Sequence, residues 1–183
     1  MNFELRVYEL ETEQRWNFLQ WFGRGATWGV VARFISFRDD HTFVSLHEAG
    51  SAVPDAPGMV KRVTVRRLAA LAAVPFDARR VAESPVIELR FYRIAPGMGA
   101  RFRQFFNERT VAAQERSGMS VCGQFDDLDD ENLFVWLRGF PDLAERDRRK
   151  ADFYQSAYWL EELQDEAFAM IEDYSNVVLV TPV

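Results

Sequence analysis

The 183-residue sequence predicts an α+β fold in which one unit of strands and helices occurs twice. Residues 3–10 match residues 87–94 at an offset of 84, and the Glu, Leu, Arg and Tyr of the two segments are identical. The elements predicted after residue 86 follow the order strand, helix, strand, strand, helix, strand, which is the split βαβ or ferredoxin-like arrangement. The earlier copy shows the same order without its second helix. We therefore expect tandem ferredoxin-like subdomains.

Both matching segments alternate between apolar and polar residues, which is the period of a half-buried strand. One face of the pair carries Phe3, Leu5, Val7, Ile87, Leu89 and Phe91. The opposite face carries Glu4, Arg6, Tyr8, Glu88, Arg90 and Tyr92. Each strand thus presents a carboxylate, a guanidinium and a phenol on one side.

The first copy is predicted to span residues 1–67. Thr12 is a plausible N-cap for an aromatic helix that Gly23 and Gly25 end. Residues 30–37 and 42–47 form a predicted hairpin, residues 49–58 a loop, and residues 60–65 a further strand. Residues 68–85 are the predicted connector, and its alanine-rich part, residues 68–74, favours a short helix that Pro75 stops.

The second copy is predicted to span residues 86–183. After the first strand, a helix with apolar residues at three-four spacing runs to about Arg116, and residues 119–125 and 133–138 form a second hairpin. Asp142 and Glu145 form a capping-box pattern at the start of another helix, whose cluster of basic and acidic residues is typical of a charged outer face. A further helical stripe extends from Leu160 to Tyr174, Asn176 breaks it, and residues 177–183 form the last strand.

The composition and charge of the chain argue against a membrane protein, a secreted protein and a protein that binds nucleic acid or anionic lipid. The chain is 48% hydrophobic and 27% charged, and its apolar runs are too short for a membrane helix. A first strand that starts near residue 2 leaves no room for a signal peptide. The net charge of −6 should repel nucleic acid and anionic lipid, so we expect neither partner. The single cysteine, Cys122, excludes an internal disulfide, which favours the reducing cytoplasm.

The polar strand faces supply the best candidate site. If the two sheets face each other, Glu88, Arg90 and Tyr92 should line the gap between them, together with Glu4, Arg6 and Tyr8 of the first copy. Such a set suits an anionic or enolic small molecule, or acid–base catalysis. The alternative is a structural Glu–Arg pair that bridges the sheets, with the tyrosines packing by their rings.

The two histidines and the acidic residues 126–131 are weaker candidates for a functional site. His41 and His47 are the only histidines and form no predicted metal site, so we expect no metal and no cofactor. His47 is a candidate catalytic residue because its strand runs beside the same gap, whereas His41 falls in a turn. The acidic residues 126–131 lack the glycine and glutamate positions of a calcium loop, so they indicate a solvated hairpin tip.

The second copy resembles the NIPSNAP family of dimeric α+β barrel proteins. The likeness rests on residues shared in order and spacing, namely 87–92, Pro96-Gly97, Gly118, Gly123, Asn132, Glu145-Arg146, Arg148-Arg149 and Trp159. The family pattern has a histidine and a tryptophan where this chain has Trp136 and Arg138, and Ser45 and His47 stand at these positions in the first copy. The resemblance implies substrate-binding positions at Trp136 and Arg138. Haem ligation by histidine, which occurs elsewhere in the superfamily, is the less favoured alternative.

Two classes of function remain open. The first is a cofactor-independent enzyme or binding protein for a small molecule, such as an anion, held between the facing sheets. The alternative is a non-catalytic protein-interaction module. A homodimer is expected in either case, because the first copy lacks one of the two helices that would cover its sheet.

Overall fold

The computed structural model describes residues 1–23, 28–56 and 58–183. The eight strands are β1 Asn2–Leu10, β2 Val30–Ser36, β3 Thr42–Glu48, β4 Val60–Ala70, β5 Val86–Ile94, β6 Ser120–Asp127, β7 Leu133–Phe140 and β8 Ile171–Pro182. The α-helices are α1 Arg15–Gly23, α2 Ala78–Ala82, α3 Gly99–Phe105, α4 Val111–Arg116, α5 Leu143–Tyr154 and α6 Gln164–Met170. Two π-helical segments, Phe106–Thr110 and Tyr158–Leu163, join α3 to α4 and lead into α6.

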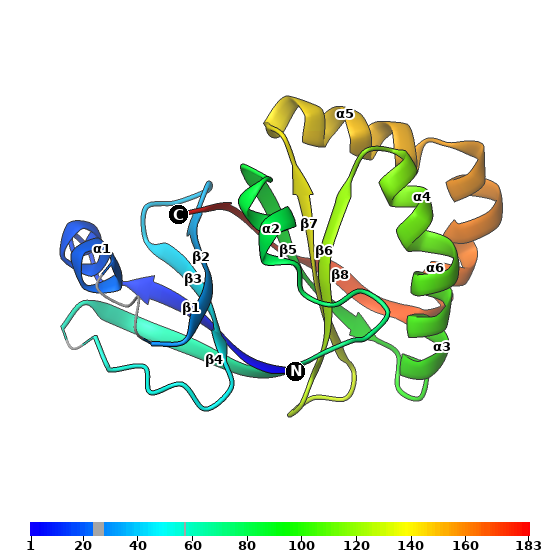
Figure 1. Cartoon of the computed structure of the whole chain (residues 1–183). Coiled ribbons are helices and arrows are strands. Elements are labelled where there is room, and N and C mark those ends of the chain that lie inside the picture. Colours follow the sequence, from blue (N-terminus) through cyan, green and yellow to red (C-terminus); the bar gives the residue numbers. More distant parts are fainter. Residues whose placement is uncertain (24–27, 57) are drawn as a thin grey trace.

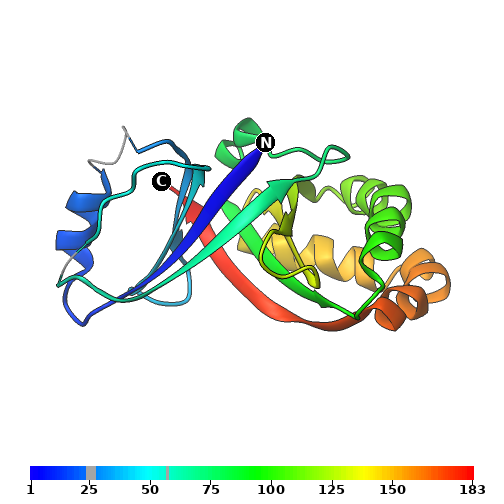
Figure 2. The same cartoon turned by 90° about the horizontal axis from the view of Figure 1, so that it is seen from below.

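The strands close into an antiparallel barrel in the order β1-β3-β2-β8-β5-β7-β6-β4. Two long strands join the halves: β4 pairs with β1 and then β6, and β8 pairs with β5 and then β2. Figures 1 and 2 show β4 and β8 running from one half of the molecule to the other. Helix α1 lies outside the first half, and the helical runs α3–α4 and α5–α6 lie outside the second.

The predicted fold class is confirmed. The second copy has the complete ferredoxin-like order of elements, and the first lacks its second helix, because residues 51–56 form neither helix nor strand. The division into residues 1–67, 68–85 and 86–183 stays a prediction, since β4 runs through two of these ranges and pairs with both halves. Gly25, expected to help end the first helix, lies outside the described residues.

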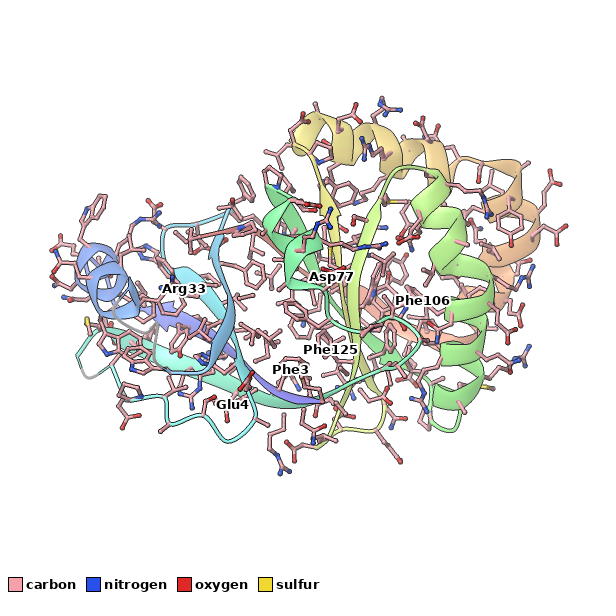
Figure 3. All side chains as sticks on the ribbon, in the orientation of Figure 1. Phe3, Glu4, Arg33, Asp77, Phe106 and Phe125 are labelled. Carbon is pink, nitrogen blue, oxygen red and sulfur yellow. The ribbon has the colours of Figure 1, made fainter. Side chains whose placement is uncertain are left out.

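Apolar side chains from both sheets fill the barrel interior. Phe3 of β1 meets Phe125 of β6 edge-on at 5.6 Å between ring centroids, and Figure 3 shows both rings between the two halves. Leu5, Leu89 and Val135 are buried in the same cluster. The apolar faces predicted for β1 and β5 therefore form the interior of the barrel.

The helix predicted for residues 68–74 is wrong. Leu68, Ala69 and Ala70 continue β4 and pair with Asp127, Asp126 and Phe125 of β6. Closing the barrel requires this pairing, and it overrides the helical propensity of the alanines. A short helix occurs later instead, at α2, where the Asp77 carboxylate accepts hydrogen bonds from the backbone N–H groups of Arg79 and Arg80.

The boundary predicted near Asn176 is also wrong. Strand β8 begins at Ile171, where the predicted helical stripe would continue, and Asn176 pairs with Phe91 within it.

The prediction of a capping box is confirmed at its N-cap: the Asp142 carboxylate accepts from the backbone N–H of Glu145 at 2.7 Å. Among the described residues, every helix is too short or too polar to span a bilayer.

Candidate ligand site between sheet and helices

The sequence suggested that the polar faces of the matching strands line the gap between the sheets. In the structure they do not. Glu88, Arg90 and Tyr92 point away from the barrel interior, toward the helices that cover the second half. The physical reason is that the apolar faces of β1 and β5 fill the barrel, so the alternate residues must lie on its outer surface. The expected site residues of the second copy therefore meet helices rather than the first copy.

Glu88 is the centre of this polar cluster, and its side chain is completely buried. Its Oε2 accepts from Arg90 Nη1 at 2.6 Å and from Arg138 Nε at 2.8 Å. Its Oε1 accepts from Arg146 Nε at 2.7 Å and from Lys150 Nζ at 3.2 Å. Burial alone would raise the pKa of Glu88, but the four cations outweigh it and hold that pKa far below its usual range.

Arg138 connects the carboxylate to the helices and is itself fully buried. Its Nη1 donates to Gln114 Oε1 at 3.0 Å and to the Tyr154 hydroxyl at 3.2 Å. Its guanidinium also lies over the Trp136 ring, 5.3 Å from the centroid. Arg138 thus fixes one residue on α4 and one on α5.

Arg90 and Tyr92 lie on the side of the polar cluster that borders a cavity. Arg90 Nε donates to the Tyr92 hydroxyl at 3.1 Å, and the Arg90 guanidinium lies over the Trp136 ring at 5.5 Å. The carboxylate and neighbouring phenols outweigh the effect of burial and raise the pKa of Arg90 above its ordinary value. Arg90 is therefore a permanent positive charge with a fixed orientation.

A cavity of about 390 Å³ lies beside Arg90 and Tyr92, between the sheet and the helices of the second half. Its other polar lining residues are Thr110, Gln114, Lys150, Tyr154 and Gln164. Most of the remaining lining is aromatic and consists of Phe102, Phe105, Phe106, Trp159, Phe168 and Tyr174. Figure 3 shows Phe106 between the helices and the sheet. A cavity of this size suits a small organic molecule.

Tyr92 and Tyr154, two of the three tyrosines that line the cavity, have pKa shifts of opposite sign. Burial raises the pKa of Tyr92 to about 12, although Arg90 opposes the shift. Burial would also raise the pKa of Tyr154, but the guanidinium groups of Arg138 and Arg90 outweigh it and lower that pKa. Tyr92 is thus a stable hydrogen-bond donor, whereas Tyr154 is the phenol that releases its proton more readily.

The first-copy candidates form a separate cluster. Arg6 Nε donates to Glu4 Oε1 at 2.5 Å, and Tyr8 packs on Phe18 and Phe22 of α1. None of Glu4, Arg6 and Tyr8 lines the second-copy cavity. The structure therefore separates the six residues into two sets of three.

His47 belongs to the first-copy cluster and is buried. Its Nδ1 lies 3.1 Å from the Trp28 carbonyl oxygen, which can only accept, so Nδ1 carries the proton. Nε2 therefore accepts from the Ser45 hydroxyl at 2.6 Å. Burial lowers the pKa of His47 and keeps the ring neutral. Within the described residues, no cluster of three His, Cys, Asp or Glu side chains could hold a metal ion.

Comparison with known proteins identifies the family. Residues 87–183, more than half of the chain, match the NIPSNAP family. This protein belongs to the NIPSNAP family. A NIPSNAP-like domain protein of Burkholderia xenovorans, described as uncharacterized, is 25% identical over 54% of this chain and 84% of its own, with a TM-score of 0.50. Curated proteins give no significant match.

Two further structures resemble this NIPSNAP protein along its whole length. One, from Lactobacillus acidophilus, is 10% identical, covers 99% of this chain and 93% of its own, and has a TM-score of 0.71. The other, from Fusobacterium nucleatum, is 11% identical, covers 99% and 91%, and has a TM-score of 0.68. Both carry the name "putative monooxygenase". At this identity the likeness extends to the fold alone.

The sequence interpretation of this NIPSNAP chain missed the residues that α5 contributes. Arg146, Lys150 and Tyr154 follow one another at four-residue spacing, which places them on one helix face toward Glu88 and the cavity. The prediction of a charged outer face holds for Arg148, which is exposed and pairs with Glu145, whereas Arg149 pairs with the same carboxylate but is part-buried. The four-residue spacing in the sequence could have identified these residues, because it distinguishes the cations that face Glu88 from those on the rest of the helix.

The acidic turn after β6 has a structural explanation. Asp127 pairs with Arg66, Asp129 with Arg67 and Asp130 with Arg93, so the turn meets arginines of β4 and β5. These ion pairs link the end of β6 to strands of both halves.

Proposed function

We propose that this NIPSNAP protein binds a small anionic molecule with an aromatic or similarly flat apolar body in the cavity beside Arg90. The observation that carries the proposal is the imbalance of charge around Glu88. Four cations surround this one carboxylate, and among the described residues the only other acid paired with them is Asp147, on Arg146. The surplus positive charge borders an aromatic cavity, where an anion would be weakly solvated and strongly attracted.

Lys150 and Arg90 are the cations best placed for the ligand, since both line the cavity. Burial lowers the pKa of Lys150, although Glu88 opposes the shift. An added anion would stabilise its charged form. Arg138, by contrast, is not among the lining residues of the cavity and contacts Glu88, Gln114 and Tyr154, so it supports the site from behind.

The cavity also holds the groups for proton transfer without a cofactor. Tyr154 is the more acidic phenol and can exchange a proton with a bound molecule, while Arg138 stabilises the phenolate. Tyr92 keeps its proton and can donate a hydrogen bond. The name carried by the two full-length structural neighbours favours small-molecule chemistry in this fold, and we extend only that class to this chain.

Binding of 2-naphthoate tests the proposal, with 2-naphthamide as the neutral analogue of the same shape. We expect saturable binding of the anion, measured by calorimetry, and weaker binding of the amide. Lys150→Gln should weaken 2-naphthoate about tenfold and leave 2-naphthamide unchanged, since a charge-assisted hydrogen bond contributes about 1.5 kcal/mol or more. Lys61→Gln is the matched control, because Lys61 is the only other lysine and lies on the exposed part of β4.

The naphthoate test has two contradicting outcomes. One is the absence of saturable 2-naphthoate binding. The other is equal loss of affinity for the anion and the amide in a Lys150→Gln protein that melts like the wild type, because the lysine would then make no contribution specific to the negative charge. Thermal denaturation of both lysine variants separates these cases.

A protein-interaction role remains the second candidate, and one surface favours it. Val63 and Val65 of β4 are 43% and 44% exposed on the sheet face that lacks a second helix. They pair with Tyr8 and Arg6 of β1, so they border the first-copy polar cluster. We propose that a second copy of the chain covers this face in a homodimer.

We also propose a cytoplasmic location. Cys122 is buried, and burial raises the pKa of its thiol to about 11, which makes it an unreactive core residue. A chain whose only cysteine is inert suits a reducing compartment.

A further inference from the structure

Thr110 and Gln114 line the cavity with polar groups that the proposed anion does not use. Thr110 lines the cavity from the end of the first π-helical segment and is only 3% exposed. Its hydroxyl has no hydrogen-bond partner among the described residues. A buried hydroxyl without a partner is uncommon, because leaving it unpaired costs stability.

Local structure explains why the Thr110 hydroxyl is unpaired. In a regular helix a threonine hydroxyl commonly bonds to the carbonyl oxygen three or four residues earlier. Here Thr110 is the last residue of the π-helical segment Phe106–Thr110, and its hydroxyl makes no such bond. Segments of this kind are often found at functional sites, since they change the direction of a side chain.

Gln114, one turn later, supplies a second polar group on the same helix face. Its Oε1 accepts from Arg138 Nη1 at 3.0 Å, and because a guanidinium can only donate, the amide oxygen must be the end that faces Arg138. The NH2 group is thereby held at the other end of the amide. Gln114 also lines the cavity.

We propose that the Thr110 hydroxyl and the Gln114 amide form a second subsite that binds a neutral oxygen of the ligand. The ligand would then be an aromatic anion that carries, elsewhere on its ring system, a hydroxyl or carbonyl oxygen. The inference rests on the proposed function for the anion, which Arg90 and Lys150 would hold from the sheet and α5. The aromatic lining, including Phe106 and Trp159, would enclose the ring system between the two subsites.

The test uses 2-naphthoate and its 1-, 3-, 6- and 7-hydroxy isomers, with Thr110→Val as the variant. Valine keeps the shape of threonine and removes the hydroxyl. We expect at least one isomer to bind the wild-type protein about fivefold more tightly than 2-naphthoate, which corresponds to one hydrogen bond. Thr110→Val should remove this preference, and Thr110→Ser, which restores the hydroxyl, should recover it.

Stability provides the second measurement. An unpaired hydroxyl contributes nothing to the empty protein, so Thr110→Val should melt at or above the wild-type temperature. A clearly lower melting temperature would overturn the proposal by showing that the hydroxyl has a structural partner. So would the lack of any preferred isomer, or a preference that survives in Thr110→Val.

The two proposals fail in different ways. If Lys150→Gln weakens 2-naphthoate but Thr110→Val leaves the isomer preference unchanged, the anion site stands and the second subsite is wrong. If Thr110→Val removes the preference but anion and amide bind the wild type equally, the second subsite stands and the anion site is wrong.

Discussion

Replacing Glu88 by glutamine is the sharpest test of the buried cluster. The substitution keeps the size of the side chain but removes the only carboxylate that Arg138 contacts within the described part of the chain, and both side chains are completely buried. Removing one partner of a buried ion pair leaves the other charge uncompensated, so we expect a loss of about 3–5 kcal/mol in the free energy of unfolding. Glu4→Gln is the matched control in the first copy. Glu4 has one arginine partner and is partly exposed, so its loss should cost less than about 1 kcal/mol.

The effect of Glu88→Gln should depend on pH in a defined direction. The pKa of Glu88 is lowered in the folded state, so its contribution is fully present above its ordinary value of 4.5 and is lost progressively as the pH falls. Between pH 5 and pH 3 the difference between wild type and variant should shrink by about 2 kcal/mol, following the linkage between proton binding and stability. Urea unfolding at several pH values measures this. A difference that is constant with pH, or similar losses for Glu88→Gln and Glu4→Gln, would refute the reasoning.

Three further predictions concern the cavity and the assembly. Arg90→Ala should lower the free energy of unfolding less than Glu88→Gln, because Arg138, Arg146 and Lys150 still neutralise the carboxylate. Arg90→Lys should keep most of the stability but weaken the binding of 2-naphthoate, because lysine lacks the planar geometry of the guanidinium. Denaturation measures the stability of both variants, and calorimetry measures the binding. The affinity for 2-naphthoate should fall as the pH rises through the pKa of Tyr154, which is lowered from its ordinary value of 10.0, because a phenolate would repel the bound anion. Tyr154→Phe should reduce this fall and leave the part that comes from deprotonation of Lys150, whose pKa burial lowers. Light scattering at micromolar concentration should give a dimer, and Val63→Lys should shift it toward the 21.2 kDa monomer; a wild-type monomer would contradict the prediction.

Most of the fold could be predicted from local patterns. The alternation in residues 3–10 and 87–94 identifies two strands, and their common motif identifies the repeat. Hairpins and helix caps also follow from short segments, as the bond from Glu145 N–H to Asp142 shows. These features depend on neighbours in the sequence, so the sequence alone was sufficient.

The two errors in the fold have one cause, which is pairing between distant strands. Residues 68–70 have helical propensity, yet they extend β4 because β6 offers a partner more than fifty residues later. Residues 171–176 extend β8 because β5 pairs with them. Closure of the barrel determines both extensions, and no local pattern records it.

The placement of the candidate site residues was predicted in part, because strand alternation defines two faces without saying what covers each. Alternation separates Glu88, Arg90 and Tyr92 from the apolar face, but it does not say which face meets the helices. Helices usually cover an apolar sheet face, which favoured placing the polar face between the sheets. The structure reverses this, and Arg146 and Lys150 of α5 contact Glu88 on the face that the helices cover.

A buried polar face under helices is difficult to explain by stability alone. An apolar cluster of the same volume would often be as stable or more stable, because burying charges carries a large desolvation cost. One arginine would suffice to neutralise Glu88, yet Arg90, Arg138, Arg146 and Lys150 all contact it. The surplus charge lies next to a cavity rather than in solid packing, and Arg90 and Lys150 line that cavity. A bound anion accounts for both the surplus and its position, whereas a purely structural ion pair accounts for neither.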